Sequence, residues 1–237
     1  MLGTLLNVIA ILIGGSIGLV RAKTLKADQE LYLKIVLGAF TVFYGLRLTW
    51  LSLNGSPLQV LKQLLIVILG MALGKLLGRL LGLQRFSNHL GQSARKLMEG
   101  KSERPMAAGF QACTILFCAA PLGILGAVQD GISGYFYPLA IKAVIEGLAA
   151  MGMAVAFRWG AVLSAIPVLA WQGTIAMSCQ VFLRPFLERH GLIDPLNAVG
   201  GMLVFSVALI ILGIKKLQIA DYLPSLIIVP TLSWLLR

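Results

Sequence analysis

Charged residues are scarce in this chain: 12% of its 237 residues are Asp, Glu, Lys or Arg, whereas 58% are hydrophobic. A soluble domain carries about 25% charged residues, so this composition excludes a water-soluble enzyme or binding module. The stretch from Met106 to Leu183 holds only four charges in 78 residues. The sequence therefore predicts an all-α polytopic membrane protein, with residues 1–237 forming a single integral membrane domain.

Histidine and cysteine are equally rare, with two and three residues. The cysteines lie in apolar segments and lack the spacing of metal ligands, so we expect neither a metal nor a cofactor. The segment Gly131–Gly134 matches the Gly-x-Ser-Gly pattern of rhomboid proteases. However, His89 and His190 both fall outside the apolar segments, and no base is available for Ser133. An enzyme is therefore not expected.

Acidic residues are outnumbered by basic ones, 9 to 20, and the net charge is +11. The basic residues sit in short loops beside apolar segments, a pattern that sets membrane orientation rather than nucleic-acid binding. The basic loop 84–106, which joins the two halves of the chain, is predicted to be cytoplasmic. Alternation then places the turn with Arg21, Lys23 and Lys26 inside as well, and the uncharged turn at residues 54–57 outside. The expected partner is the lipid bilayer.

Eight segments are apolar and about long enough to span a bilayer. They are Leu2–Val20, Leu31–Leu51, Leu58–Leu83, Ala107–Val128, Tyr137–Phe157, Ala161–Leu183, Leu196–Ile214 and Tyr222–Leu236. The last is short and contains two prolines, so we expect seven or eight transmembrane helices. The first lacks a basic leader and a cleavage site, which predicts a retained helix. Residues 86–98 have apolar residues at helical spacing, which fits a helix on an anionic membrane surface or a solvated loop.

A weak similarity links a stretch of the second segment, Val36–Arg47, to Val199–Phe205 and the later Leu212–Lys215 around the seventh; both end in Gly, an aliphatic residue and a cation. We hypothesise an inverted repeat of helices one to three against helices six to eight, an arrangement common among secondary transporters. Chance resemblance between apolar helices is the alternative.

Glycine is abundant, with 26 residues. Two segments carry it at every fourth position: Gly14 and Gly18 in the first, and Gly70, Gly74, Gly78 and Gly82 in the third. Such faces let helix backbones approach closely. The spacing predicts tight helix packing, either within the chain or with a second subunit, and we expect a homodimer.

The stretch Pro121–Gly134 interrupts an apolar run with a proline and four glycines, and it also contains Gln129 and Asp130. A broken helix exposes backbone groups, which membrane proteins tolerate only against protein or a water-filled cavity. We interpret it as a discontinuous helix that places Asp130 at a pore or binding site. The alternative is an external loop in which Asp130 caps the next helix.

Three further polar residues lie inside predicted spans. Lys142 and Glu146 are four apart on one helical face and can pair; Glu146 is otherwise a candidate for proton exchange or cation binding. Gln172 follows Pro167 in a second proline-broken helix, where it would bind a solute or bond a neighbouring helix. Gln129, Asp130, Lys142, Glu146 and Gln172 are thus the candidate substrate-binding residues.

These motifs resemble a bacterial family called domain of unknown function 554, the YqgA-like inner-membrane proteins. The resemblance rests on residues 112–134, the Lys142 and Glu146-Gly147 pair, residues 164–173, and the stretches 212–215 and 221–224. Glu146 stands where the family pattern leads us to expect aspartate. The resemblance implies a protein of the bacterial plasma membrane and supplies no substrate.

The sequence thus favours a small transporter or channel for an ion or compact polar solute. If transport is proton-coupled, Asp130 or Glu146 would be the carrier. The alternative is a non-transporting membrane scaffold or lipid-interacting protein that assembles through its glycine faces.

Overall fold

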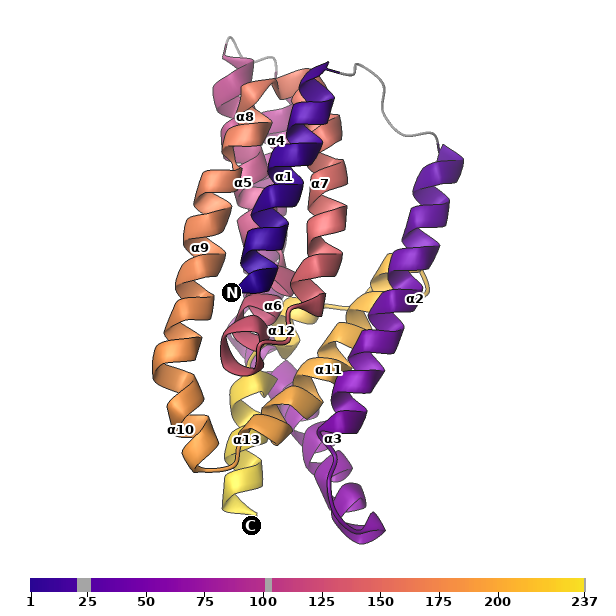
Figure 1. Cartoon of the computed structure of the whole chain (residues 1–237), viewed down its shortest axis with the longest axis vertical. Coiled ribbons are helices and arrows are strands. Elements are labelled where there is room, and N and C mark those ends of the chain that lie inside the picture. The colour runs from indigo at the N-terminus through magenta and orange to yellow at the C-terminus, as the bar shows by residue number, and fades with distance from the viewer. Residues whose placement is uncertain (21–26, 101–103, 237) are drawn as a thin grey trace. The chain divides into compact units, whose positions relative to one another are not determined.

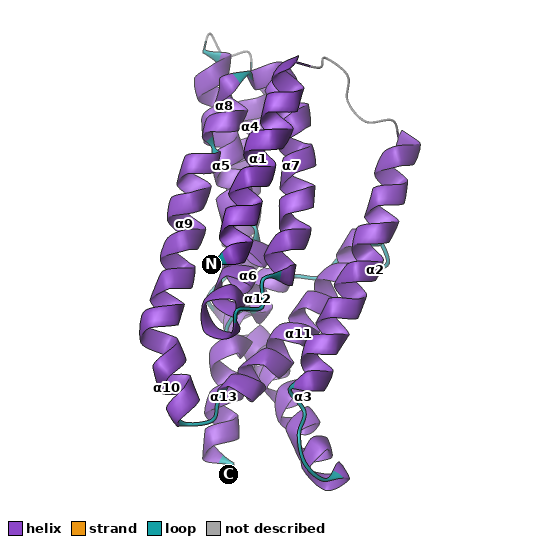
Figure 2. Ribbon diagram, viewed as in Figure 1, coloured by secondary structure: helices purple, strands orange, loops and turns teal. Residues whose placement is uncertain are grey.

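The computed structural model describes residues 1–20, 27–100 and 104–236, and all regular structure in those ranges is helical (Figures 1 and 2). The all-α prediction is therefore confirmed. Arg21, Lys23, Lys26 and Lys101, which entered the predicted orientation, lie outside the described residues. The helices are α1 (Leu2–Val20), α2 (Ala27–Leu51), α3 (Pro57–Leu80), α4 (Leu83–Glu99), α5 (Pro105–Ala119), α6 (Pro121–Ser133), α7 (Tyr137–Phe157), α8 (Trp159–Leu163), α9 (Ala165–Ser178), the π-helix η1 (Cys179–Leu183), α10 (Arg184–Arg189), α11 (Ile193–Ile211), α12 (Ile219–Tyr222) and α13 (Ser225–Leu235).

Six stretches of the described chain are long and apolar enough to cross a membrane on their own. They are α1, α2, α3, α7, the continuous stretch Trp159–Arg189, and α11. A seventh crossing results if α5 and α6, which meet at an angle of 57°, form one bent span. The last apolar stretch, Ile219–Leu235, is shorter. The predicted seven or eight spans agree with the structure at their lower value, and only if α5 and α6 count as one span.

The helices pack into two compact units. Unit 1 comprises Met1–Leu31 and Phe86–Met177, and unit 2 comprises Tyr32–Arg85 and Ser178–Arg237. The first helix thus packs with the middle of the chain, whereas α3 packs with the C-terminal helices. The predicted repeat groups the first three helices together and does not follow this division, so it stays a prediction.

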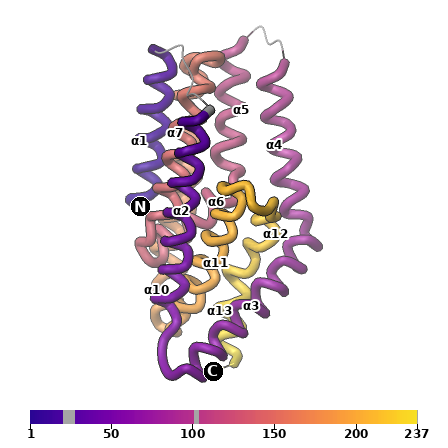
Figure 3. The backbone as a smooth tube through the Cα atoms, turned by 90° about the vertical axis from the view of Figure 1, so that its right-hand side faces the viewer, coloured from indigo at the N-terminus to yellow at the C-terminus, as the bar shows by residue number. Residues whose placement is uncertain are grey.

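Unit 1 is built on the close packing of α1 against α7, which lie side by side in Figures 1 and 3. A Cβ atom on Gly14 would overlap the carbonyl oxygen of Gly147, and one on Gly18 would overlap that of Met151. Gly3 likewise lies against Leu139. The contacts advance in the same direction along both helices, so α1 and α7 run parallel. Helices α5, α6 and α8 also pack against α7.

Unit 2 uses glycine in the same way between α3 and the C-terminal helices. Gly70, Gly74 and Gly78 lie against Val229, Ser225 and Asp221, respectively, so α3 runs antiparallel to this segment. Gly82 differs, because it follows α3 with φ +68° and, its chain neighbours aside, no described residue comes within 4 Å of its Cβ position. The partners of both glycine faces are therefore found in the same chain.

The basic loop contains a helix, α4, whose exposed side includes Arg95 and Lys96. Residues 86–98 are therefore helical rather than a loop, and their placement on a membrane surface stays a prediction. Its start is held within unit 2, where Asp221 Oδ1 accepts a hydrogen bond of 2.9 Å from the backbone N–H of Gln84. Asp221 thus caps α4, a helix that lies far earlier in the sequence.

The proline-containing segments differ in how they are interrupted. Pro121 is the first residue of α6, directly after the 57° bend. Pro167 lies in the first turn of α9, and the break falls three residues earlier, at Ser164 between α8 and α9. Gln172 is therefore on a regular part of α9.

The α1–α7 packing predicts opposite effects for two glycine-to-alanine changes. We expect Gly14→Ala to lower the free energy of unfolding by about 1–3 kcal/mol, because its methyl group would overlap Gly147. Gly152→Ala on α7 is the matched control, since no described residue outside its own helix turn lies within 4 Å of its Cβ position. Alanine there should be neutral or stabilising by up to about 1 kcal/mol. Denaturation of the purified protein in detergent measures both, and equal effects would contradict the packing.

Candidate functional site

Unit 1 encloses a set of polar side chains that are almost completely buried. Each of them exposes 5% or less of its surface: Asn7, Gln129, Asp130, Lys142, Glu146 and Gln172. They come from α1, α6, α7 and α9. Five are the residues that the sequence predicted, and Asn7 was missed.

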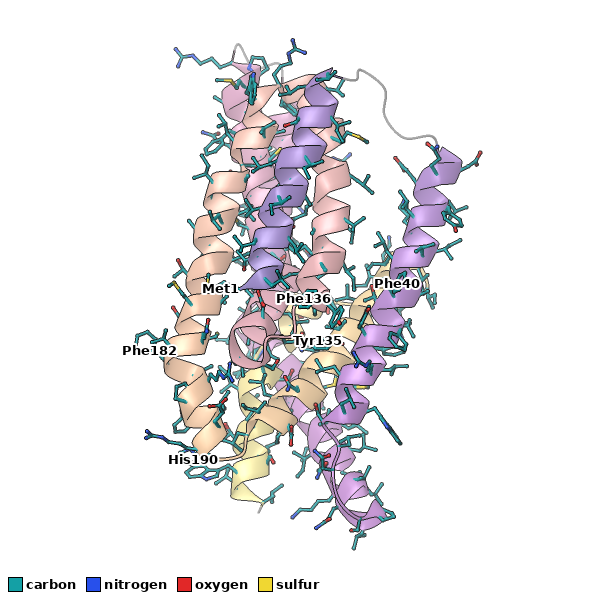
Figure 4. The ribbon with its side chains drawn as sticks, viewed as in Figure 1. Met1, Phe40, Tyr135, Phe136, Phe182 and His190 are labelled. Atoms are coloured by element: carbon teal, nitrogen blue, oxygen red, sulfur yellow. The ribbon has the colours of Figure 1, made fainter. Side chains whose placement is uncertain are left out.

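Asp130 on α6 forms hydrogen bonds with the N-terminal end of α1. Its Oδ2 accepts hydrogen bonds from the backbone N–H groups of Gly3 (3.0 Å) and Thr4 (3.4 Å). Its Oδ1 lies 3.2 Å from the amino group of Met1. Figure 4 shows Met1 at the end of α1 that meets α6. The first N–H groups of a helix lack partners within the helix, and the positive end of its dipole favours a carboxylate.

The alternative in which Asp130 sits in a loop and caps the next helix therefore does not describe the structure. Asp130 is in α6, and the helix that it caps begins more than a hundred residues earlier in the sequence. Gly134, with φ +68°, ends α6 in the left-handed conformation that glycine adopts most readily. Tyr135 and Phe136 then lead into α7 (Figure 4).

Lys142 and Glu146 form an ion pair one turn apart on α7, as their spacing predicted. The Lys142 Nζ also donates to the backbone carbonyl of Phe117 on α5, at 2.9 Å. The other oxygen of Glu146, Oε2, accepts from Asn7 Nδ2 of α1 at 2.8 Å. The pair therefore bonds to helices on both sides of α7.

Asn7 connects this ion pair to Gln172. Its Nδ2 also donates to Gln172 Oε1 on α9, at 3.1 Å. Gly123 of α6 lies beside the same groups: its Cβ position is 2.8 Å from Lys142 Cε and 3.3 Å from Gln172 Nε2. A larger residue at 123 would therefore press on the lysine and the glutamine together. We call Asn7, Lys142, Glu146 and Gln172 the polar network.

Several buried polar atoms near these residues have no hydrogen-bond partner in the described part of the chain. They are both side-chain amide atoms of Gln129, Gln172 Nε2, Asn7 Oδ1 and Thr4 Oγ1. Nearly all buried polar groups in proteins are hydrogen-bonded. Gln129 is the extreme case, because both the oxygen and the nitrogen of its fully buried amide lack a hydrogen-bond partner among the described residues.

The predicted residues thus divide into three arrangements. Lys142, Glu146 and Gln172 come together through Asn7, whereas Asp130 holds the end of α1 and Gln129 bonds to neither. Asn7 could have been found from the sequence, because it is the only amide side chain in the apolar segment Leu2–Val20. Polar residues in such helices commonly bond across to a neighbouring helix.

Comparison with known proteins gives one family and two full-length relatives. The model of the family described as "Protein of unknown function (DUF554)" matches residues 2–234. The chain is 30% identical over 237 residues to "Uncharacterized membrane protein YdfK" of Bacillus subtilis, covering 100% of this chain and 97% of that protein. It is 27% identical over 232 residues to "Uncharacterized protein YqgA" of Escherichia coli, covering 98% and 96%. No solved structure matches significantly.

The ion pair predicts strong non-additivity between its two members. Lys142→Met leaves Glu146 buried without its cation, and we expect a loss of about 3–5 kcal/mol in the free energy of unfolding. Adding Glu146→Gln removes the uncompensated charge and keeps an oxygen for Asn7, so the double variant should recover most of that loss. Unfolding of all four proteins in detergent completes the cycle. Additive losses would show that the two charges do not depend on each other.

Proposed function

The chain belongs to the DUF554 family, and we propose that it transports a small ion or compact polar solute across the bacterial inner membrane. The membrane class itself is supported by the apolar spans and by the name of the Bacillus subtilis relative, an uncharacterized membrane protein. The proposed path runs through unit 1, from Asp130 and Gln129 to the polar network. The observation that carries the proposal is the fully buried Gln129 amide with no partner among the described residues.

For the unpartnered amide of Gln129, energetics favour a functional over a structural role. A buried polar group without a partner costs about 1–3 kcal/mol, and a charge at membrane depth costs about as much or more. Apolar side chains of similar size would pack unit 1 without that cost. Polar atoms with unused bonding capacity are instead what a polar solute, or water accompanying it, requires along its path.

The parallel packing of α1 and α7 supports a complete crossing by α5 and α6. If α2 and α3 each cross once, α7 can run parallel to α1 only when the segment between α3 and α7 also crosses once. A re-entrant α5–α6 hairpin would reverse α7. The bent pair then carries Gln129 and Asp130 to the side of the membrane on which α1 and α7 begin, which the predicted orientation makes the outside.

In this proposal Asp130 and Gln129 form the entrance, and the polar network lies deeper. Asn7 is four residues beyond Gly3, which is about 6 Å along α1 at 1.5 Å per residue. Glu146 is the candidate proton carrier, because its buried carboxylate lies beside the ammonium of Lys142 and can exchange a proton with it. Lys142 would set whether Glu146 keeps or releases this proton. The Nε2 of Gln172, which has no partner among the described residues, would donate to the solute.

The scaffold alternative loses its proposed assembly surfaces. Gly14 and Gly18 are covered by α7, and Gly70, Gly74 and Gly78 by the C-terminal helices of the same chain. A homodimer, if formed, would have to use other surfaces.

A change at Gln129 separates function from stability. Gln129→Met keeps the side-chain length but removes the unpaired amide, so we expect unchanged or increased thermal stability. If the amide serves transport, the same variant should lose solute flux at least about tenfold, the equivalent of one hydrogen bond of about 1.4 kcal/mol. A flux and current screen in proteoliposomes, with and without a pH gradient, measures this.

Gln111→Met is the matched control, because Gln111 lies on the exposed surface of α5. It should leave flux unchanged. Flux that survives Gln129→Met at the wild-type rate would remove Gln129 from the path. Absence of flux for cations, anions and small metabolites, from folded wild-type protein, would contradict transport itself.

A further inference from the structure

Unit 2 contains a cleft of about 420 Å³ that the proposed transport path does not use. It lies where α2 ends and α3 begins, beside the start of α11 and the end of α13. Volumes of about 300–1,000 Å³ are typical of small-molecule sites. The first turns of both α3 and α11 line this cleft. If these two helices span the bilayer, the cleft therefore lies at a membrane–water boundary.

The rim of the cleft is polar and held by its own hydrogen bonds. Asn54 exchanges two bonds with the side chain of Gln63, at 3.1 and 2.9 Å. The Gln59 side chain accepts from the backbone of Ser56 at 2.8 Å and completes the cap of α3. The rim is thus tied together by hydrogen bonds within the chain.

Two opposite charges line this cleft without pairing with each other. Lys62 Nζ donates to the backbone carbonyl of Leu236, and Asp194 Oδ2 accepts from Asn54 Nδ2 at 3.2 Å. Among the described residues, each charged group thus bonds only to a neutral partner. The ammonium retains donors, and Asp194 Oδ1 receives no hydrogen bond from a described residue. The starts of α3 and α11 add positive dipole ends beside the lysine.

The floor of the cleft is apolar, with Ile66, Val67 and Val229 among its lining residues. Next to it, the outer face of α3 exposes Leu58, Leu61 and Leu65. A polar group in the cleft can therefore continue into an apolar chain that lies along α3. The arrangement combines separated charges, a polar rim and an adjacent lipid-facing surface.

We propose that this cleft binds a zwitterion that carries a primary ammonium and an anionic oxygen group. The ammonium would bond to Asp194 and the anion to Lys62. Phosphoethanolamine has this chemistry, either as the headgroup of phosphatidylethanolamine or as a free solute. Anionic ligands without an ammonium would leave Asp194 opposed to like charge.

Native mass spectrometry of the full chain in detergent tests this with three probes: phosphatidylethanolamine, phosphatidylglycerol and free phosphoethanolamine. We expect one saturable site for a phosphoethanolamine-bearing probe and weaker binding of phosphatidylglycerol. Saturation by the lipid alone identifies a headgroup site, and saturation by the free compound identifies a solute site. Equal binding of both lipids, or no saturable binding of any probe by folded protein, would overturn the proposal.

Variants of the two charged residues test whether the ligand binds in this cleft. Asp194→Asn and Lys62→Gln should each weaken binding about tenfold, as expected for loss of one charged hydrogen bond. Lys62→Arg keeps the cation and should bind nearly as the wild type does. Asp28→Asn and Lys215→Gln, at exposed positions outside the cleft, are the matched controls. Because Lys62 and Asp194 are exposed, all variants should fold. Unchanged binding by both cleft variants would contradict the assignment.

Discussion

The ion pair between Lys142 and Glu146 is the interaction on which unit 1 depends. Two charges buried among apolar helices are tolerated only when they compensate each other and when their remaining donors and acceptors find partners. Phe117 of α5 satisfies the lysine, and Asn7 of α1 satisfies the glutamate and extends the contact to Gln172. The pair on α7 therefore specifies which helices surround it. The glycines of α1 make this possible, because only close backbone approach lets Asn7 reach across.

A second carboxylate orients the same helix from its end. Asp130 bonds to the first N–H groups of α1, so α1 is held at its start by α6 and along its length by α7. Unit 2 uses the same solution, since Asp221 accepts from the start of α4. These carboxylates are satisfied by structure, whereas Gln129 is not. That contrast is why the transport proposal gives Gln129 more weight than the buried charges, which already have partners.

Local patterns in the sequence predicted what local chemistry determines. The apolar runs marked the helices, the i,i+4 spacing predicted the Lys142–Glu146 pair, and the glycine spacing indicated close packing. Which helices contact one another could not be predicted from these local patterns, because contacts such as Gly3–Asp130 join residues 127 positions apart. Asn7 was overlooked since a single amide in an apolar helix has no periodic pattern. The cleft in unit 2 is formed by three separate segments and leaves no motif in the sequence.

The central claim is that polar molecules from the aqueous phase reach the buried amide at position 129. Thiol labelling tests it most directly, in a background where Cys113, Cys118 and Cys179 are replaced by alanine. A Gln129→Cys variant in proteoliposomes of mixed orientation would be treated with a water-soluble methanethiosulfonate reagent. Ile132→Cys, on the same helix and also fully buried, is the comparison. The account predicts that position 129 is labelled and position 132 is not. If neither position is labelled in folded protein, unit 1 is dry and the transport path proposed through it is wrong.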